Sequence, residues 1–125
     1  MGFTAPPAPE LDPESVAEGE RLYTTNCASC HMPDRSGQPN WKIANDDGTY
    51  PPPPHDNSGH TWHHPDELLV GIIRDGLDVG VPSAMPTFGG LLSDDEISTI
   101  IDFLKSEWGE QEQAFQWQVT WQGEQ

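Results

Sequence analysis

Apolar residues recur at helical spacing in three segments of the chain. Within residues 12–26, 65–76 and 93–108 they stand three or four positions apart, which predicts three helices. The rest of the chain reads as loop. The positions that define the three segments are Val16, Gly19 and Tyr23, then Leu68, Leu69, Ile72 and Ile73, and finally Ile97, Ile100, Ile101, Leu104 and Trp108.

Residues at the ends of these segments support the helices. Asp12 is a good N-cap residue, and Pro13 suits the first helical position. Ser93 with Glu96 three residues later has the pattern of a capping box. Gly76 is a natural stop for the second helix.

The remaining segments predict a loop-rich chain with two terminal extensions. Residues 1–11 form a Pro-rich arm that we expect to be flexible, followed by one domain over residues 12–108. The region 34–64 is a loop of about 30 residues, which is unusual in a small domain unless it wraps a bound group. In the tail, 109–125, apolar residues alternate from Phe115 to Trp121, which predicts an extended strap over the body or a partner-binding segment.

Composition and charge narrow the function. Hydrophobic residues make up 34% of the chain, so a bound apolar group would help to complete the core. The net charge of −16 excludes nucleic acid and anionic membrane surfaces as partners. The longest apolar run, from Leu68 to Ile73, is too short to span a bilayer. Residues 26–93 carry a net charge of −5 and the other positions −11, so we expect an acidic body behind a nearly neutral contact surface.

The two cysteines lie in one motif, Cys27-Ala28-Ser29-Cys30-His31. A redox-active C-x-x-C is a weak interpretation, because no strand precedes it. A zinc site with His60 and His64 would need a much longer spacing than small zinc domains use. C-x-x-C-H also signals covalent attachment of haem, with two thioethers and an adjacent histidine ligand.

Met85 is the candidate for a second haem ligand. Met1 is terminal, and Met32 adjoins His31 and so cannot reach the opposite haem face. Met85 lies in a loop bounded by Pro86 and two glycines, where it could also simply fill a core. A thioether opposite an imidazole raises the haem potential and closes the sixth coordination site, which suits electron transfer.

Together these features resemble a class I c-type cytochrome of the bacterial monohaem type. The resemblance rests on Gly19 and Tyr23 before C-A-S-C-H, on Met85-Pro86, and on a closing helix with Phe103. It implies an all-α cytochrome c fold, with three to four helices and long loops around one covalent haem c. Gly19 and Tyr23 would pack crosswise against Phe103, as in that family. The stretch from Pro51 to Asp66 resembles a loop found in a subset of these cytochromes.

The resemblance also assigns roles to residues. Cys27 and Cys30 would anchor the haem, and His31 and Met85 would be the axial ligands of its iron. The family usually has a proline whose carbonyl orients the proximal histidine. The candidates here are Pro39 and Pro51 to Pro54.

Four further histidines allow more than one interpretation. His55, His60, His63 and His64 could gather around a copper or zinc ion, in a metal-binding or sensing module. We favour a loop over the haem edge, in which Trp62 and His63 bind the propionates. A histidine could also displace Met85, and protonation of a histidine near neutral pH could tune the potential.

We therefore expect a soluble single-electron carrier rather than an enzyme. A haem domain of a larger oxidoreductase complex is the alternative. In the family that the sequence resembles, haem is attached outside the bacterial cytoplasm, so the resemblance implies a periplasmic or extracytoplasmic location and a signal peptide that is removed or absent. We expect a monomer. The acidity favours redox partners with a basic docking surface, with no nucleic acid and no membrane span.

Overall fold

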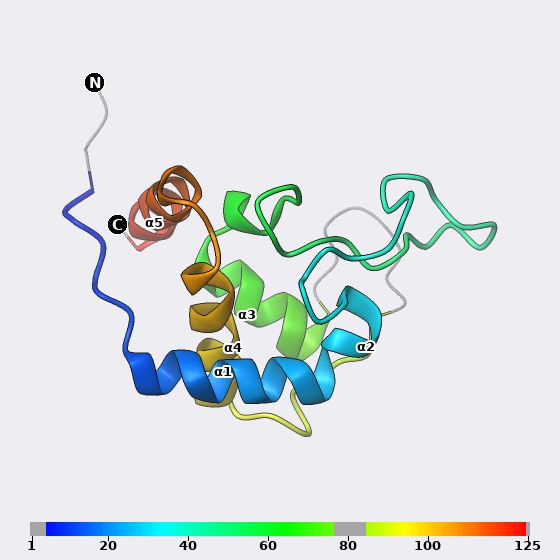
Figure 1. Cartoon of the computed structure of the whole chain (residues 1–125), viewed down its shortest axis with the longest axis horizontal. Coiled ribbons are helices and arrows are strands. Elements are labelled where there is room, and N and C mark those ends of the chain that lie inside the picture. Colours follow the sequence, from blue (N-terminus) through cyan, green and yellow to red (C-terminus); the bar gives the residue numbers. More distant parts are fainter. Residues whose placement is uncertain (1–4, 77–84, 125) are drawn as a thin grey trace.

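A computed structural model describes residues 5–76 and 85–124 of the chain. Over these ranges the fold is helical and contains no strand (Figure 1). The elements are α1 (Pro13–Asn26), α2 (Ala28–His31), the 3-10 helix η1 (Thr61–His63), α3 (Asp66–Asp75), α4 (Asp94–Ser106) and α5 (Glu110–Gly123). The expected all-α fold is confirmed.

The predicted helix ends are confirmed at three places. The Asp12 side chain accepts a hydrogen bond from the Glu14 N–H at the start of α1. Ser93 and Glu96 form both hydrogen bonds of the capping box that starts α4. Gly76 adopts the left-handed conformation, φ 69°, that ends α3. The third predicted helix stops two residues early, at Ser106.

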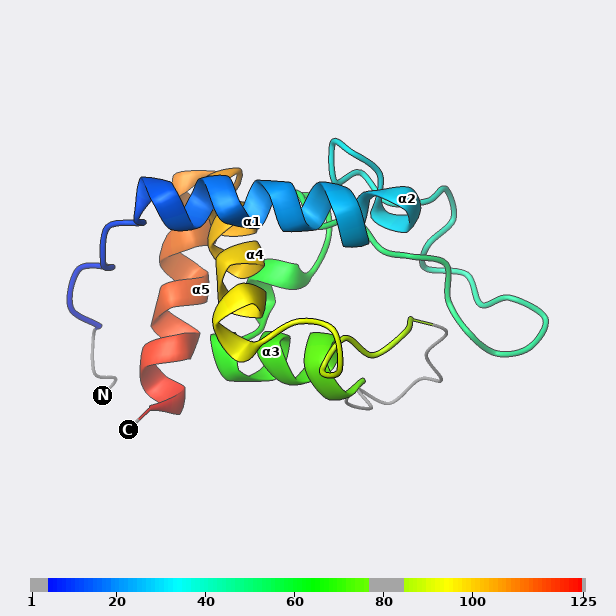
Figure 2. The ribbon, with the colours of Figure 1, turned by 90° about the horizontal axis from the view of Figure 1, so that it is seen from below.

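The core lies where α1 crosses α4, as Figure 2 shows. Gly19 lies against the backbone of Thr99, and the rings of Tyr23 and Phe103 are 5.4 Å apart. This is the crosswise packing that the resemblance implied. The α3 helix packs on α4 and adds Leu69 to the same core. The crossing fixes the end of α1, from which the cysteine motif continues.

The C-terminal segment is a helix, so the predicted extended strap is wrong. The buried residues of α5 are Gln116 and Thr120, four apart and therefore on one helical face. The Gln116 amide donates to the backbone oxygen of His64 at 3.1 Å and to an Asp66 carboxylate oxygen at 2.7 Å. The alternation of apolar residues wrongly predicted an extended segment, because the side of this helix that faces the body is formed by polar side chains.

The N-terminal arm lies along α5. The backbone N–H of Ala5 donates to the side chain of Gln118, and the Trp117 indole N–H donates to the Pro6 carbonyl at 2.6 Å. These bonds do not support the expected flexibility for residues 5 and 6, and residues 1–4 lie outside the described ranges. No helix in the described parts is both long and apolar enough to cross a membrane.

Candidate functional site

The cysteine motif sits on a single turn of helix at the end of α1. Cys27 closes α1 through its N–H, which donates to Tyr23, and its own carbonyl accepts the N–H of His31 at 2.9 Å. Cys27 is half-buried and Cys30 is exposed, and neither forms a disulfide. Burial, with a smaller effect of Cys30, raises the pKa of the Cys27 thiol to about 11. Both sulfurs are therefore free thiols that can be linked to a ligand.

His31 is buried and held by one strong contact. Its Nδ1 lies 2.8 Å from the carbonyl oxygen of Pro53, to which it donates. This bond leaves Nε2 as the nitrogen available to a metal, which is how a second contact orients a histidine ligand. Burial lowers the pKa of His31, against an opposing effect of the Pro53 hydrogen bond, so the imidazole is neutral. Among the five candidate prolines, the structure selects Pro53.

A second imidazole packs on the first. The rings of His55 and His31 have centroids 4.1 Å apart. His55 donates its N–H to the Arg35 carbonyl, its Nδ1 is 2.6 Å from the Thr61 hydroxyl, and its carbonyl accepts the Trp108 indole N–H at 2.9 Å. Removal from water, with a smaller effect of His31, lowers the pKa of His55 to about 3. His55 therefore stays neutral near pH 7 and cannot act as a switch there.

Met85 is half-buried in a segment held against the end of α3. The N–H groups of Phe88 and Gly89 donate to the carbonyls of Ile73 and Arg74 at 2.9 and 3.0 Å. The earlier part of the predicted ligand loop, Leu77–Ala84, lies outside the described residues. Met85 therefore belongs to a short segment that is hydrogen-bonded to the end of α3, whereas His31 lies at the end of α2.

These side chains fit a covalently bound haem. They supply two free thiols one helical turn apart, a neutral imidazole with its Nδ1 already occupied, and one thioether.

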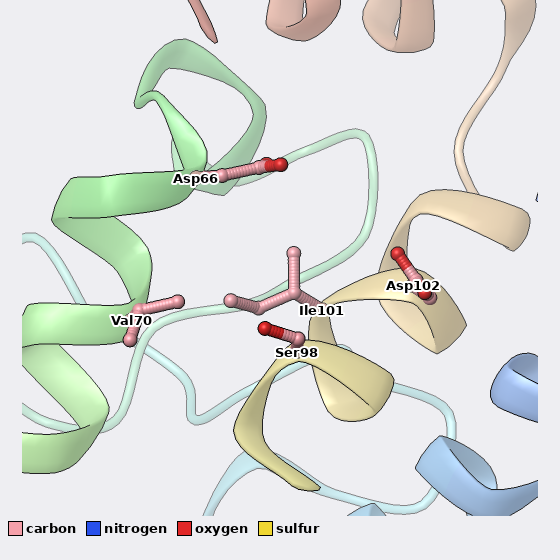
Figure 3. A pocket seen from close by; sticks show the side chains of 5 residues that line it. All are labelled: Asp66, Val70, Ser98, Ile101 and Asp102. Atoms are coloured by element: carbon pink, nitrogen blue, oxygen red, sulfur yellow. The ribbon is translucent and has the colours of Figure 1, made fainter. Parts of the chain in front are cut away.

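Two cavities lie elsewhere in the fold, where α3 and α4 meet α5 and the N-terminal arm. The smaller, about 40 Å³, could hold a water molecule or two (Figure 3). The larger, about 320 Å³, is bordered by residues of the arm, α4 and α5. Neither is lined by His31 or Met85.

Trp62 and His63, the expected propionate contacts, lie against α5. The Trp62 indole N–H donates to the Asn57 carbonyl at 3.2 Å. The His63 ring contacts the rings of Trp62, His60 and Phe115. Their role toward haem stays a prediction.

The second-metal interpretation of the histidines is not supported. Over residues 5–76 and 85–124 there is no group of three or more His, Cys, Asp or Glu side chains that could hold a metal ion. His55 packs on His31 instead of joining the other three histidines. The zinc site that combined the cysteines with His60 and His64 fails for the same reason.

Two residues of this region were missed by sequence reasoning. Arg35 follows His31 in the loop and carries the carbonyl that holds His55. Trp108 was assigned to the third helix, and its indole instead holds the carbonyl of His55. Neither role has a local signal, because both depend on partners far away in sequence.

The fold and this motif together define a c-type cytochrome domain. Residues 14–104 match the protein family described as cytochrome c oxidase, cbb3-type, subunit III, and the chain belongs to that family. It therefore carries one covalently bound haem c and transfers electrons, as expected from its resemblance to class I c-type cytochromes.

Two curated relatives are similar to the chain. The cbb3-type cytochrome c oxidase subunit FixP of Azorhizobium caulinodans is 32% identical over 98 residues, 78% of this chain and 31% of that protein. Cytochrome c6 of Diacronema lutheri is 28% identical over 102 residues, 75% of this chain and 98% of that protein. The chain thus spans about a third of FixP and nearly all of cytochrome c6. No solved structure matches.

Proposed function

We propose that Cys27 and Cys30 bind haem c through two thioethers and that His31 and Met85 are the axial ligands of its iron. The observation that carries this proposal is the 2.8 Å hydrogen bond from His31 Nδ1 to Pro53, which orients a buried neutral imidazole immediately after the cysteine pair. The alternative ligand histidines are less suited. His55 has its Nδ1 and both backbone groups engaged, and His63 lies against α5.

The chain's own residues make the site suitable for one-electron transfer. When bound, haem c supplies an iron that alternates between the ferric and ferrous states. Pro53 fixes the orientation of His31, so this ligand need not reorganise when the charge on the iron changes. Tyr23 donates its hydroxyl to the Met32 carbonyl at 2.7 Å and holds the turn after His31 against the core. The packed core of α1, α3 and α4 excludes water from this side.

The electron partners follow from charge and from the relatives. A net charge of −16 favours an encounter with a basic protein surface. The similarity to a cbb3-type oxidase subunit favours, as a second candidate, a haem domain that works within an oxidase complex. Covalent haem attachment and the likeness to cytochrome c6 support a periplasmic or other extracytoplasmic location.

A redox titration followed by the optical spectrum tests the ligand set. Met85→Ala should remove the weak near-red band of Met-ligated ferric haem and lower the midpoint potential, because the thioether favours ferrous iron. Met32→Ala is the matched control, since Met32 is the other internal methionine and the residue is 38% exposed. A Met85→Ala protein with the spectrum and potential of the control would refute Met85 as the ligand.

The aromatic tail adds a candidate contact surface. Phe115 on α5 is exposed and packs edge-on against Trp62 on η1, with their ring centroids 5.4 Å apart. An aromatic pair of this kind is a common anchor in protein interfaces. If it meets the redox partner, Phe115→Ala should slow electron transfer to the partner at temperatures where the variant is fully folded. Ala114→Gly, at the adjacent exposed position of α5, should leave transfer unchanged.

A further inference from the structure

Arg35 carries a positive charge that is largely withdrawn from water, and one nitrogen of its guanidinium has no hydrogen-bond partner in the described parts of the chain. Its side chain is 18% exposed. The guanidinium lies over the ring of Phe103, 5.5 Å from the ring centroid. One guanidinium nitrogen donates to the Pro33 carbonyl at 3.4 Å, and the charge also interacts with the exposed Asp34 carboxylate. Glu107, which forms an ion pair with it at 3.6 Å, is 41% exposed, so water competes for that carboxylate. The Nε of Arg35 is buried and has no hydrogen-bond partner among the described residues.

A charge removed from water in this way lowers the stability of the fold unless it interacts favourably with another group. A buried charged group with incomplete hydrogen bonding destabilises a fold, and replacement by an apolar side chain of similar size is often neutral or stabilising. The backbone adds to the cost, because Arg35 has φ 66°, in the left-handed region. The guanidinium is held by its contacts with Phe103, Glu107 and the Pro33 carbonyl. An uncharged side chain of similar size could fill the same space, so these contacts alone do not require a cation at this position.

The charge lies in the loop that carries the proximal histidine. Arg35 is four residues after His31, and its carbonyl accepts the N–H of His55, whose ring packs on the His31 imidazole. The charge of the guanidinium also acts on Tyr23, whose hydroxyl contacts the turn after His31. Tyr23, whose hydroxyl donates to the Met32 carbonyl, has a pKa raised mainly by burial, and the Arg35 charge opposes part of that rise.

We propose that Arg35 supplies a fixed positive charge on the proximal side that favours the ferrous state of the bound haem. Reduction lowers the charge of the iron by one, so a cation held nearby and away from water stabilises the reduced form relative to the oxidised form. Glu107 offsets this only in part, because its carboxylate is 41% exposed and water competes for it. The inference rests on the proposed attachment of the haem at His31, but not on the identity of the second ligand.

Three variants of the haem-loaded protein test the proposal. Arg35→Met keeps an apolar side chain of similar length and removes the charge, while Arg35→Lys keeps a charge. Arg21→Met removes an equal charge from α1, where Arg21 is 62% exposed and pairs with Glu18. For each, the midpoint potential is measured by spectroelectrochemistry and the melting temperature by circular dichroism.

The expected signature separates a charge effect from a structural one. Arg35→Met should have a lower midpoint potential than both the wild type and Arg21→Met, with an equal or higher melting temperature. Arg35→Lys should retain most of the wild-type potential. The proposal is overturned if Arg35→Met has the potential of Arg21→Met, or if its potential falls only together with its melting temperature and the wild-type optical bands. Because all variants share the same ligands, refutation of Met85 as a ligand would leave this comparison intact.

Discussion

Gly19 allows α1 and α4 to cross at very short distance. A Cβ placed on Gly19 would lie 1.8 Å from the carbonyl oxygen of Thr99 and 2.9 Å from the Cβ of Phe103. The first overlap is with backbone, so no side-chain rotation relieves it. Helix propensity alone favours the opposite outcome, because alanine in the middle of a helix is about 1 kcal/mol better than glycine. Gly19→Ala therefore sets packing against propensity.

Packing should win. To accept the methyl group, α1 must move away from α4, which separates Tyr23 from Phe103 and opens the core of the domain. Overpacking of this kind costs about 1–3 kcal/mol and more where backbone must shift. Because the overlap is with backbone, the cost lies at the upper end, about 3 kcal/mol, and the gain in propensity returns about 1 kcal/mol. We therefore expect Gly19→Ala to lower the free energy of unfolding by about 2 kcal/mol. For a domain of this size each kcal/mol lowers the melting temperature by about 4 °C.

Thermal unfolding of the haem-loaded protein, followed by circular dichroism at 222 nm, measures this change. Gly123→Ala is the control, because Gly123 is also helical but has no atom within 4 Å of its added Cβ. The control should melt at or slightly above the wild-type temperature. A Gly19→Ala protein that melts no lower than this control would show that the close crossing does not exist.

Two further substitutions and one truncation have expected outcomes that unfolding measurements can check. Ser93→Ala removes the capping box with Glu96 and should cost about 1 kcal/mol, whereas an unchanged stability would contradict the cap. Trp108→Phe leaves the buried ring but loses the 2.9 Å hydrogen bond to His55, so it should cost about 1 kcal/mol and shift the haem potential more than Ser93→Ala does. Deleting residues 109–125 removes the buried amide contacts of α5, at about 1 kcal/mol for each hydrogen bond, and a shortened chain that melts like the wild type would assign the tail to a partner instead.

The parts of the fold that local chemistry controls could be predicted from the sequence. A helix N-terminus needs acceptors for its free N–H groups, and Asp12 and Ser93 are among the few residue types that provide them. The left-handed stop at Gly76 likewise favours a residue without Cβ. Each of these signals acts within four residues, so it is visible in the sequence without knowledge of the fold.

The C-terminal helix could not be predicted in this way. Its inner face is defined by Gln116 and Thr120. These polar residues can be buried because they form hydrogen bonds with Asp66 and with the carbonyl of His64. A hydrophobic pattern cannot reveal a face whose contacts are hydrogen bonds. The alternation of aromatic residues was real, but it reflects half-exposed positions around the helix rather than one side of a strand.

The proximal site shows the same division. The motif Cys27 to His31 is local and was predicted, while the choice of Pro53 among five prolines depended on how the long loop returns to α2. His55 was grouped with His60, His63 and His64 in one loop because it is near them in sequence. In the fold its backbone forms hydrogen bonds with Arg35 and Trp108, and these bonds place its ring against His31. Spacing along the chain could not separate these two destinations.

The acidic residues of the chain fall into two groups, one that stabilises helices and one that can take part in docking, and salt affects stability and docking separately. Eight of the 21 acidic residues lie in the first turns of α1, α3, α4 and α5, where a negative charge stabilises the helix. That part of the net charge serves folding, so neutralising it would weaken the protein whatever its partner. Exposed acids outside these turns, such as Glu10 and Glu20, remain available for docking. A dependence of electron-transfer rate on ionic strength would therefore report on docking only if the melting temperature is constant over the same range of salt.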